Sequence, residues 1–229
     1  MTNSGAPVLL VHGWGGSFSE TWQRSGMTAL IEDAGRTVIG VDLLGHGSAP
    51  KPHDPAEYED LTARILEALP AEPVDAIGFS LGAITLLQLT CQHPGRLQRL
   101  VLGGIGENVF RADEERRARL VAGVEGRAAD SDVDAQVFAN YANRPGQDAV
   151  ALAAVLKRTS SYALTPERLA AIDIPVLVAI GDKDFAGPGD PLAAAIPTST
   201  LKVLRNVDHF ATPEAFAFID AALEFLDCV

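Results

Sequence analysis

Gly78-Phe79-Ser80-Leu81-Gly82 is the stretch whose residue types and spacing point most directly to chemistry. A serine becomes a nucleophile when a nearby base takes the proton of its hydroxyl group. Two glycines at this spacing allow a strand to turn into a helix within one or two residues, because only glycine lets the backbone segments approach so closely. We therefore predict that Ser80 projects from a sharp turn, beside the unpaired N–H groups of a helix N-terminus.

Apolar runs that end at polar loops predict the elements that position this serine. Each run is short and bounded by breaker residues, as expected of buried strands. Helical patterns separate most of them, for example over 19–34, 54–69 and 82–93. This alternation predicts the α/β class, with a doubly wound, mostly parallel sheet of about six strands. The predicted strands are 8–11, 37–42, 74–78, 100–103, 175–180 and 201–204.

Segment 106–165 differs from the rest of the chain in its pattern of apolar and charged residues. Charged helical patterns alternate there with breaks that contain Gly and Asp, and no run resembles a buried strand. Such a length without a strand, inside an alternating chain, indicates a helical insertion. We predict a core formed by 1–105 and 166–229, and an inserted helical unit over 106–165.

Candidate reactive residues all follow predicted strands. Ser80 follows the third strand, two aspartates follow the fifth and His209 follows the sixth. Ligands of doubly wound sheets bind beyond the carboxyl ends of the strands. We therefore expect these side chains to meet at one edge of the sheet.

Composition limits the classes of partner. The 229 residues carry a formal net charge of −12, which argues against nucleic acid or an anionic membrane as a partner. The first seven residues contain no basic residue, and the apolar run 8–11 is too short for a signal peptide or a membrane span. The spacing of Cys91 and Cys228 is not that of metal ligands, and we expect two free thiols. These features favour a cytoplasmic protein.

Five motifs together resemble those of the α/β-hydrolase fold family. The stretch 78–82 resembles its nucleophile elbow, 12–16 its His-Gly oxyanion loop, and 42–47 the loop after the next strand. The stretches 181–184 and 208–210 are similar to its acid and histidine loops, in the family's order of Ser, Asp and His. The motifs are most similar to those of serine carboxylesterases, with the pimeloyl-ester esterase, enol-lactone hydrolase and cofactor-free haloperoxidase groups nearest. The resemblance implies a minimal version of this fold.

The resemblance also implies catalytic roles. Ser80 is the expected nucleophile, His209 the base and Asp184 the acid that orients the imidazole. Asp182 is the alternative acid, because a shift of one register position in the motif would exchange the two. The backbone N–H groups of Trp14 and Leu81 are the expected oxyanion hole.

The inserted unit resembles the family's helical cap, which is expected to roof the site. Aromatic residues from the cap and the core would then line the substrate pocket, although such residues often belong to the core instead. The candidates are Phe79, Phe110, Phe138, Tyr141, Tyr162, Phe185 and Phe210.

The sequence thus predicts a hydrolase of small, mainly apolar carboxylic esters or lactones that forms an acyl-enzyme on Ser80. Neither a cofactor nor a metal is expected. The same three residues also serve carbon–carbon bond hydrolases, thioesterases and lyases of this fold. A receptor that binds a ligand without turning it over is the non-enzymatic alternative.

Overall fold

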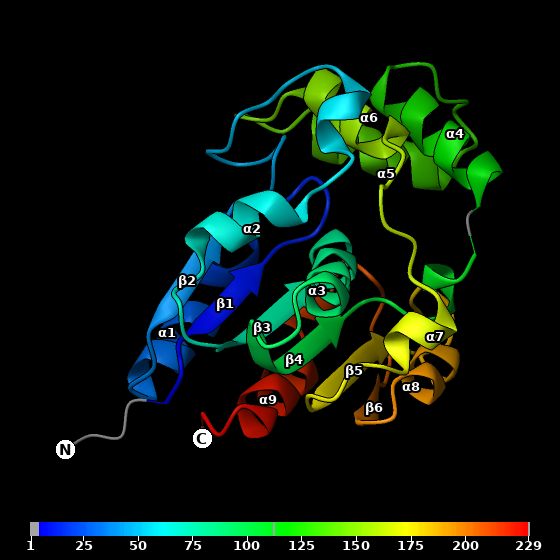
Figure 1. The fold of residues 1–229 in the computed structure, drawn as a ribbon. Helices are drawn as coiled ribbons and strands as arrows, with labels where there is room; N and C mark the ends of the chain where they lie inside the picture. Colours follow the sequence, from blue (N-terminus) through cyan, green and yellow to red (C-terminus); the bar gives the residue numbers. More distant parts are fainter. Residues whose placement is uncertain (1–4, 112, 229) are drawn as a thin grey trace.

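The computed structural model describes residues 5–111 and 113–228. Six parallel strands form one sheet in the order β2-β1-β3-β4-β5-β6 (Figure 1). The strand order reverses between β1 and β3, so a crevice is expected where their carboxyl ends diverge. The predicted α/β class and parallel sheet are confirmed. The strands are β1 (Val8–Val11), β2 (Val38–Val41), β3 (Val74–Phe79), β4 (Leu97–Gly103), β5 (Val176–Gly181) and β6 (Ser199–Leu204).

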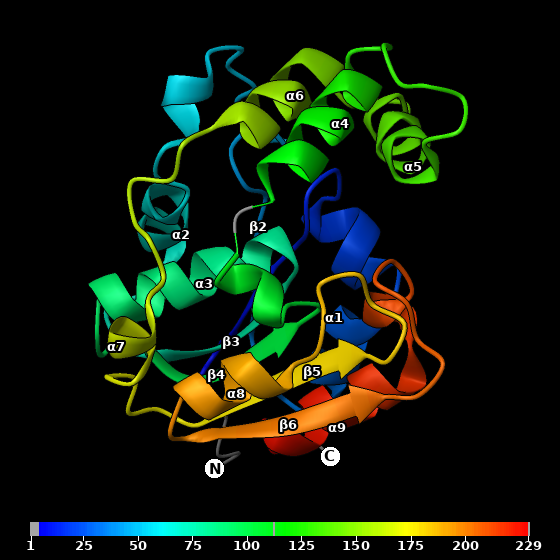
Figure 2. The same cartoon turned by 90° about the vertical axis from the view of Figure 1, so that its right-hand side faces the viewer.

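Helices cover both faces of the sheet (Figure 2). One apolar cluster joins α1 and α9 to one face, and a second joins α2, α3 and α8 to the other. Alternate side chains of a strand point to opposite faces, so Leu9 lies in one cluster and Leu10 in the other, both fully buried. These helices are α1 (Met27–Asp33), α2 (Thr62–Ala68), α3 (Leu81–Gln92), α8 (Asp190–Ala195) and α9 (Phe216–Phe225).

Three further helices lie beyond the carboxyl ends of the strands, at the top of Figure 1. We call α4 (Glu114–Val124), α5 (Val133–Ala142) and α6 (Ala149–Lys157) the inserted helices. An aspartate caps each one, since the carboxylates of Asp113, Asp132 and Asp148 accept backbone N–H groups of the first turns. Their apolar sides form a small core of their own. The short helix α7 (Pro166–Leu169) follows as the chain returns to β5.

Two segments that the sequence predicts as single helices are interrupted. The first predicted helix, 19–34, is broken at Gly26, which adopts a left-handed conformation at φ +83° just before α1 begins. In the second, Asp60 accepts the N–H of Thr62 and competes with the helix. The observed pieces are a π-helical turn (Ser19–Gln23) before α1 and a 3₁₀ turn (Pro55–Tyr58) before α2.

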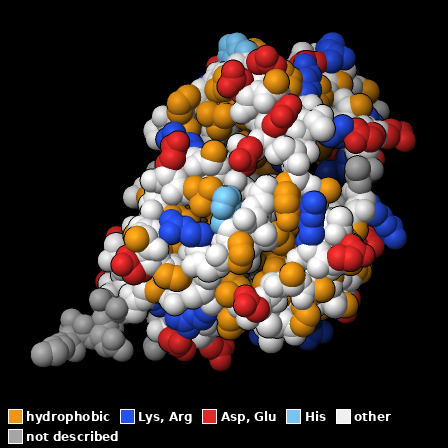
Figure 3. All heavy atoms as spheres, in the orientation of Figure 1, with side chains coloured by type: hydrophobic (Ala, Val, Ile, Leu, Met, Phe, Trp, Pro, Cys, Tyr) orange, Lys and Arg blue, Asp and Glu red, His pale blue; other side chains and the backbone are white. Residues whose placement is uncertain are grey.

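The surface seen in Figure 3 mixes acidic and basic side chains, with apolar side chains between them. None of the helices in the described part of the chain is both long and apolar enough to cross a membrane. Cys91 and Cys228 are free thiols.

Candidate active site

Ser80, His209 and Asp184 form one chain of hydrogen bonds. The Oγ of Ser80 lies 2.9 Å from Nε2 of His209. The other ring nitrogen, Nδ1, lies 2.9 and 3.0 Å from the two oxygens of Asp184. The three residues follow β3, β6 and β5, and they meet at the carboxyl edge of the sheet.

The turn that carries Ser80 depends on its two glycines. Ser80 has φ +51° and ψ −114°, a conformation that residues with a side chain rarely adopt. A Cβ atom on Gly82 would lie 2.4 Å from the carbonyl oxygen of Val11, and one on Gly78 would lie 2.7 Å from Cα of Ala83. Larger residues at either position would push the strand and helix apart, so the glycines keep the serine on its sharp turn.

Close contact between the loops after β5 and β6 brings the acid to the histidine. A Cβ atom on Gly181 would lie 2.0 Å from the carbonyl oxygen of Val207, so only glycine permits this approach. Asp184 also accepts the backbone N–H of Ala186 at 2.8 Å. Asp182, the alternative acid, accepts the N–H of Asn206 instead. The geometry therefore favours Asp184 as the partner of His209.

The neighbours of His209 determine which ring nitrogen carries a proton. An ionised carboxylate only accepts hydrogen bonds, so Nδ1 donates to Asp184. In the neutral ring Nε2 then offers its lone pair to the hydroxyl of Ser80. Phe79 and Phe185 pack against the ring at centroid distances of 5.0 and 4.1 Å. This arrangement suits a general base that activates a hydroxyl group.

Two backbone N–H groups are available beside the nucleophile. Those of Trp14 and Leu81 donate to no protein acceptor among the described residues. Leu81 is the first residue of α3, where the helix dipole favours negative charge. A Cβ atom on Gly13 would lie 3.2 Å from Cβ of Ser80, so the glycine keeps the space next to the serine open. These features suit stabilisation of an oxyanion.

The loops after β1 and β2 hold two buried histidines that play a different part. His12 donates from Nδ1 to the carbonyl oxygen of Gly13 and accepts the N–H of Leu43 at Nε2. Nδ1 of His46 pairs with the carbonyl oxygen of Leu44. Burial lowers the pKa of His12, and it lowers the pKa of His46 to about 3. Both rings are therefore neutral at ordinary pH.

Asp42 organises the same pair of loops. Its carboxylate accepts the backbone N–H groups of Ser48 and Phe18 and the hydroxyl of Ser48. Burial opposes ionisation, but these hydrogen bonds outweigh it and lower the pKa of Asp42. The carboxylate thus closes the loop after β2 against the loop after β1.

A cavity of about 260 Å³ opens beside Ser80 and His209. Of the predicted pocket residues, Phe79, Phe138, Tyr141 and Phe210 line it. Phe185 packs on His209 instead and lines a neighbouring cavity.

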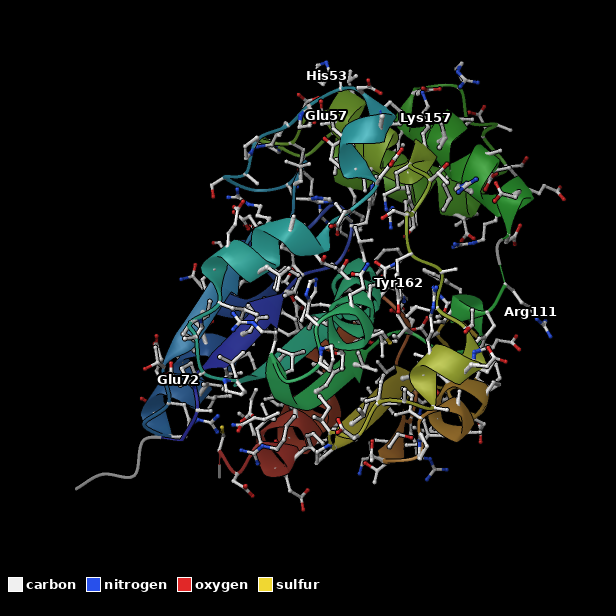
Figure 4. All side chains as sticks on the ribbon, in the orientation of Figure 1. His53, Glu57, Glu72, Arg111, Lys157 and Tyr162 are labelled. Atoms are coloured by element: carbon white, nitrogen blue, oxygen red, sulfur yellow. The ribbon has the colours of Figure 1, made fainter. Side chains whose placement is uncertain are left out.

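Two of the predicted pocket residues lie away from this cavity. Phe110 packs at the edge of the apolar core. Tyr162 lies in the segment between α6 and α7, with the guanidinium of Arg168 4.1 Å from its ring centroid (Figure 4). Both residues belong to segments that join the inserted helices to the core. The sequence does not indicate where the side chains of such segments point.

The polar side of the cavity was not predicted. Arg24 lies there, 3.3 Å from Glu20 and 4.0 Å from Glu214. Arg144 lies over the ring of Tyr141 at 3.7 Å. These residues come from separate turns and carry no motif, so only the fold brings them together. In the described ranges, no group of three or more His, Cys, Asp or Glu residues is arranged to hold a metal ion.

A family profile described as the alpha/beta hydrolase fold matches residues 6–136, more than half of the chain. The chain belongs to this family, as its motifs predicted.

Comparison with individual relatives adds detail. A pimeloyl-[acyl-carrier protein] methyl ester esterase of Neisseria meningitidis is 29% identical over 92% of this chain and 89% of that protein. An uncharacterized protein of Mycobacterium tuberculosis is 36% identical over 115 residues, and the match spans 48% of this chain and about a third of that protein, 33%. The crystal structure of an enol-lactonase from Burkholderia xenovorans superposes with a TM-score of 0.69 at 23% identity, over 99% of this chain and 94% of that one. At that identity the superposition shows the fold alone.

Proposed function

We propose that this protein is a serine hydrolase that cleaves small, mainly apolar carboxylic esters or lactones. The observation that carries the proposal is the continuous hydrogen-bond chain from Ser80 through His209 to Asp184. The Neisseria relative, named for the hydrolysis of a methyl ester, supports this substrate class.

Each residue of the chain has one task in this reaction. His209 takes the proton of Ser80 at Nε2 as Oγ attacks the carbonyl carbon of the ester. Asp184 holds the imidazole in the required tautomer and stabilises the imidazolium that forms. His209 then gives the proton to the leaving alcohol, which leaves an acyl group on Ser80. Water, activated by the same histidine, releases the acid and restores the enzyme.

The N–H groups of Trp14 and Leu81 are the proposed oxyanion hole. They would donate to the negative oxygen of the tetrahedral intermediate, and donors of this kind typically account for about 10²–10³ in rate. No cofactor or metal is needed for this chemistry.

The cavity and the helices above it support a small substrate. A volume of about 260 Å³ lies slightly below the usual range for ligand pockets, and aromatic side chains form much of its wall. We assign the inserted helices the role of a cap, with the core formed by 1–105 and 166–229. A cytoplasmic enzyme without nucleic-acid or membrane partners remains our proposal for its setting, on the net charge of −12.

The test is hydrolysis of p-nitrophenyl esters with acyl chains of graded length, by the wild type and by Ser80→Ala. We expect turnover that is greatest for short chains and lost in the variant. Turnover that persists in the variant would refute the role of Ser80. Binding without turnover of any ester, thioester or lactone would instead favour a receptor. Selective cleavage of a vinylogous diketone would point to a carbon–carbon bond hydrolase.

A further inference from the structure

The inserted helices hold the loop that carries the proposed oxyanion donor. The indole Nε1 of Trp14 donates to the carbonyl oxygen of Leu152, in α6, at 3.1 Å. The same indole stacks on Phe138 of α5, with centroids 4.7 Å apart and an interplanar angle of 27°. The side chain of Trp14 is thus fixed by the inserted helices, and its backbone directly follows Gly13, where a Cβ atom would lie 3.2 Å from Cβ of Ser80.

Gln147 makes a second attachment, one residue further along the loop. Gln147 lies in the turn between α5 and α6, and its Nε2 donates to the carbonyl oxygen of Gly15 at 2.8 Å. This bond fixes the direction of the amide, because only the nitrogen can donate to a carbonyl oxygen. The other amide atom, Oε1, is buried and bonds to no protein donor among the described residues. A buried polar atom without a partner costs folding free energy, so stability alone does not explain why a glutamine occupies position 147.

From the core side, the loop is held before and after Trp14 and Gly15 rather than at these two residues. The carbonyl oxygen of Gly13 accepts from Nδ1 of His12 at 2.7 Å and from the N–H of Gly16 at 3.2 Å, and Asp42 accepts the N–H of Phe18 further along. Gly15 has φ +71°, and a Cβ atom there would lie only 3.4 Å from Cβ of Tyr141, so α5 packs directly on the backbone. A glycine-rich backbone is conformationally free unless external contacts fix it. At Trp14 and Gly15, the hydrogen bonds and stacking contact that fix the loop come from the inserted helices.

We propose that Gln147 and the indole N–H of Trp14 are positioning residues, which hold the backbone N–H of Trp14 where the oxyanion forms. The oxyanion hole is then complete only while the inserted helices are seated on the loop. This inference rests on the proposed function, since it needs a reaction that creates an oxyanion.

Such a role predicts a particular kinetic signature. The oxyanion exists only in the transition state and the tetrahedral intermediate, so loss of its donor lowers kcat and leaves KM nearly unchanged. A residue that merely supports the cavity would raise KM or lower stability instead. The two roles can therefore be separated by steady-state kinetics.

The experiment compares two variants with a matched control. Gln147→Met keeps the length of the side chain but removes the donor, and Trp14→Phe keeps an aromatic ring but removes the indole N–H. The control is Gln88→Met, because Gln88 of α3 also bonds to the segment beyond the inserted helices. Its Nε2 donates to Oγ of Ser160 and to the carbonyl oxygen of Tyr162, both at 2.8 Å, away from the oxyanion loop.

We expect Gln147→Met and Trp14→Phe each to lower kcat for a p-nitrophenyl ester by about three- to tenfold, the range expected for one neutral hydrogen bond. KM should change by less than about twofold, and Gln88→Met should leave both constants within about twofold of the wild type. An aryl trifluoromethyl ketone, which forms a tetrahedral adduct with serine, should bind more weakly to the first two variants in proportion to their loss of kcat/KM.

Three results would overturn the inference. The first is an unchanged kcat in both Gln147→Met and Trp14→Phe, and the second is an equal loss in Gln88→Met. The third is a loss of kcat without a parallel loss of ketone affinity. If Gln147→Met does not fold, the kinetics and ketone affinity of Trp14→Phe alone test the inference. Turnover that requires Ser80 but is insensitive to these variants would refute only this inference, whereas turnover that survives Ser80→Ala would refute the proposed function.

Discussion

Three histidines beyond the carboxyl ends of the strands are all buried but have different partners: His209 follows β6, His12 follows β1 and His46 follows β2. His209 is 5% exposed, and His12 and His46 are fully buried. Nε2 of His209 faces a hydroxyl group, whereas Nε2 of His12 is occupied by a backbone N–H. Nδ1 of His209 pairs with a carboxylate, whereas those of the other two pair with backbone carbonyl oxygens.

This difference explains why we propose His209, and not His12 or His46, as the base. Burial alone disfavours the charged ring and produces a neutral, structural histidine. A carboxylate at Nδ1 compensates for the charge that arises when Nε2 takes a proton. A lone pair aimed at a side-chain hydroxyl then has a proton to accept. Only the β6 end of the sheet meets both conditions.

The largest expected effect is a contrast between two glutamine substitutions. His209→Gln should lower kcat for ester hydrolysis by about 10⁴–10⁶, because the nucleophile loses its base. His46→Gln should lower kcat by less than about tenfold, since His46 faces no reacting group in this mechanism. Steady-state kinetics of both folded variants would measure the contrast. Comparable losses of kcat in the two variants would show that His209 and His46 do not differ in role.

The next effect concerns the acid. Asp184→Asn should lower kcat by about 10⁴, as expected when an amide favours the wrong tautomer of the histidine. Asp182→Asn should stay near the wild-type rate, because the carboxylate of Asp182 bonds to the N–H of Asn206 rather than to His209. Kinetics at one pH would suffice as the measurement. The reverse result would assign the acid to Asp182.

A smaller effect concerns stability and pH. The pKa of His46 falls from 6.5 to about 3 in the folded protein, mainly through burial. Below about pH 6.5, His46 therefore binds a proton in the unfolded chain but not in the folded chain. The unfolding free energy decreases as the pH falls from there toward about 3. Relative to His46→Gln, the wild type should lose roughly 2–3 kcal/mol of unfolding free energy between about pH 7 and about pH 4.5. Denaturant unfolding at both pH values would measure this, and parallel losses in the two proteins would contradict it.

The smallest effect is at an exposed histidine. His53 lies beside the inserted helices (Figure 4), 2.9 Å from Asp148, with 58% of its side chain exposed. His53→Ala should change the unfolding free energy by less than about 1 kcal/mol, because exposed ion pairs contribute little. Asp148→Ala should cost about 1 kcal/mol or more, since it also removes the cap of α6. Thermal unfolding of both variants would rank them, and a larger loss for His53→Ala would contradict this order.

The fold could be predicted from the sequence where a local pattern of residues determines the structure. The strands are short apolar runs with breakers at both ends, so the parallel sheet and the family follow from the sequence and are confirmed. Two flanking glycines permit the sharp turn at Ser80, and this whole signal lies within five consecutive residues.

Contacts between distant segments lay beyond the sequence. Gln147 meets Gly15 across 132 positions, and no local pattern marks a glutamine that points at a loop. Arg24 and Glu214 share the cavity although they belong to turns at opposite ends of the chain. Tyr162 looked like a pocket residue by type, but its direction depends on how the returning segment packs. The unit boundaries at 105 and 166 stay predictions.

The backbone of Ser80 also restricts which alcohols could act at this position. Ser80 has φ +51°, and two substituents on Cβ strongly disfavour a positive φ because they crowd the neighbouring peptide groups. Threonine, a secondary alcohol, would therefore add backbone strain to this turn in place of serine. The shape of the main chain thus favours a primary alcohol at this position, independently of acidity or hydrogen bonding.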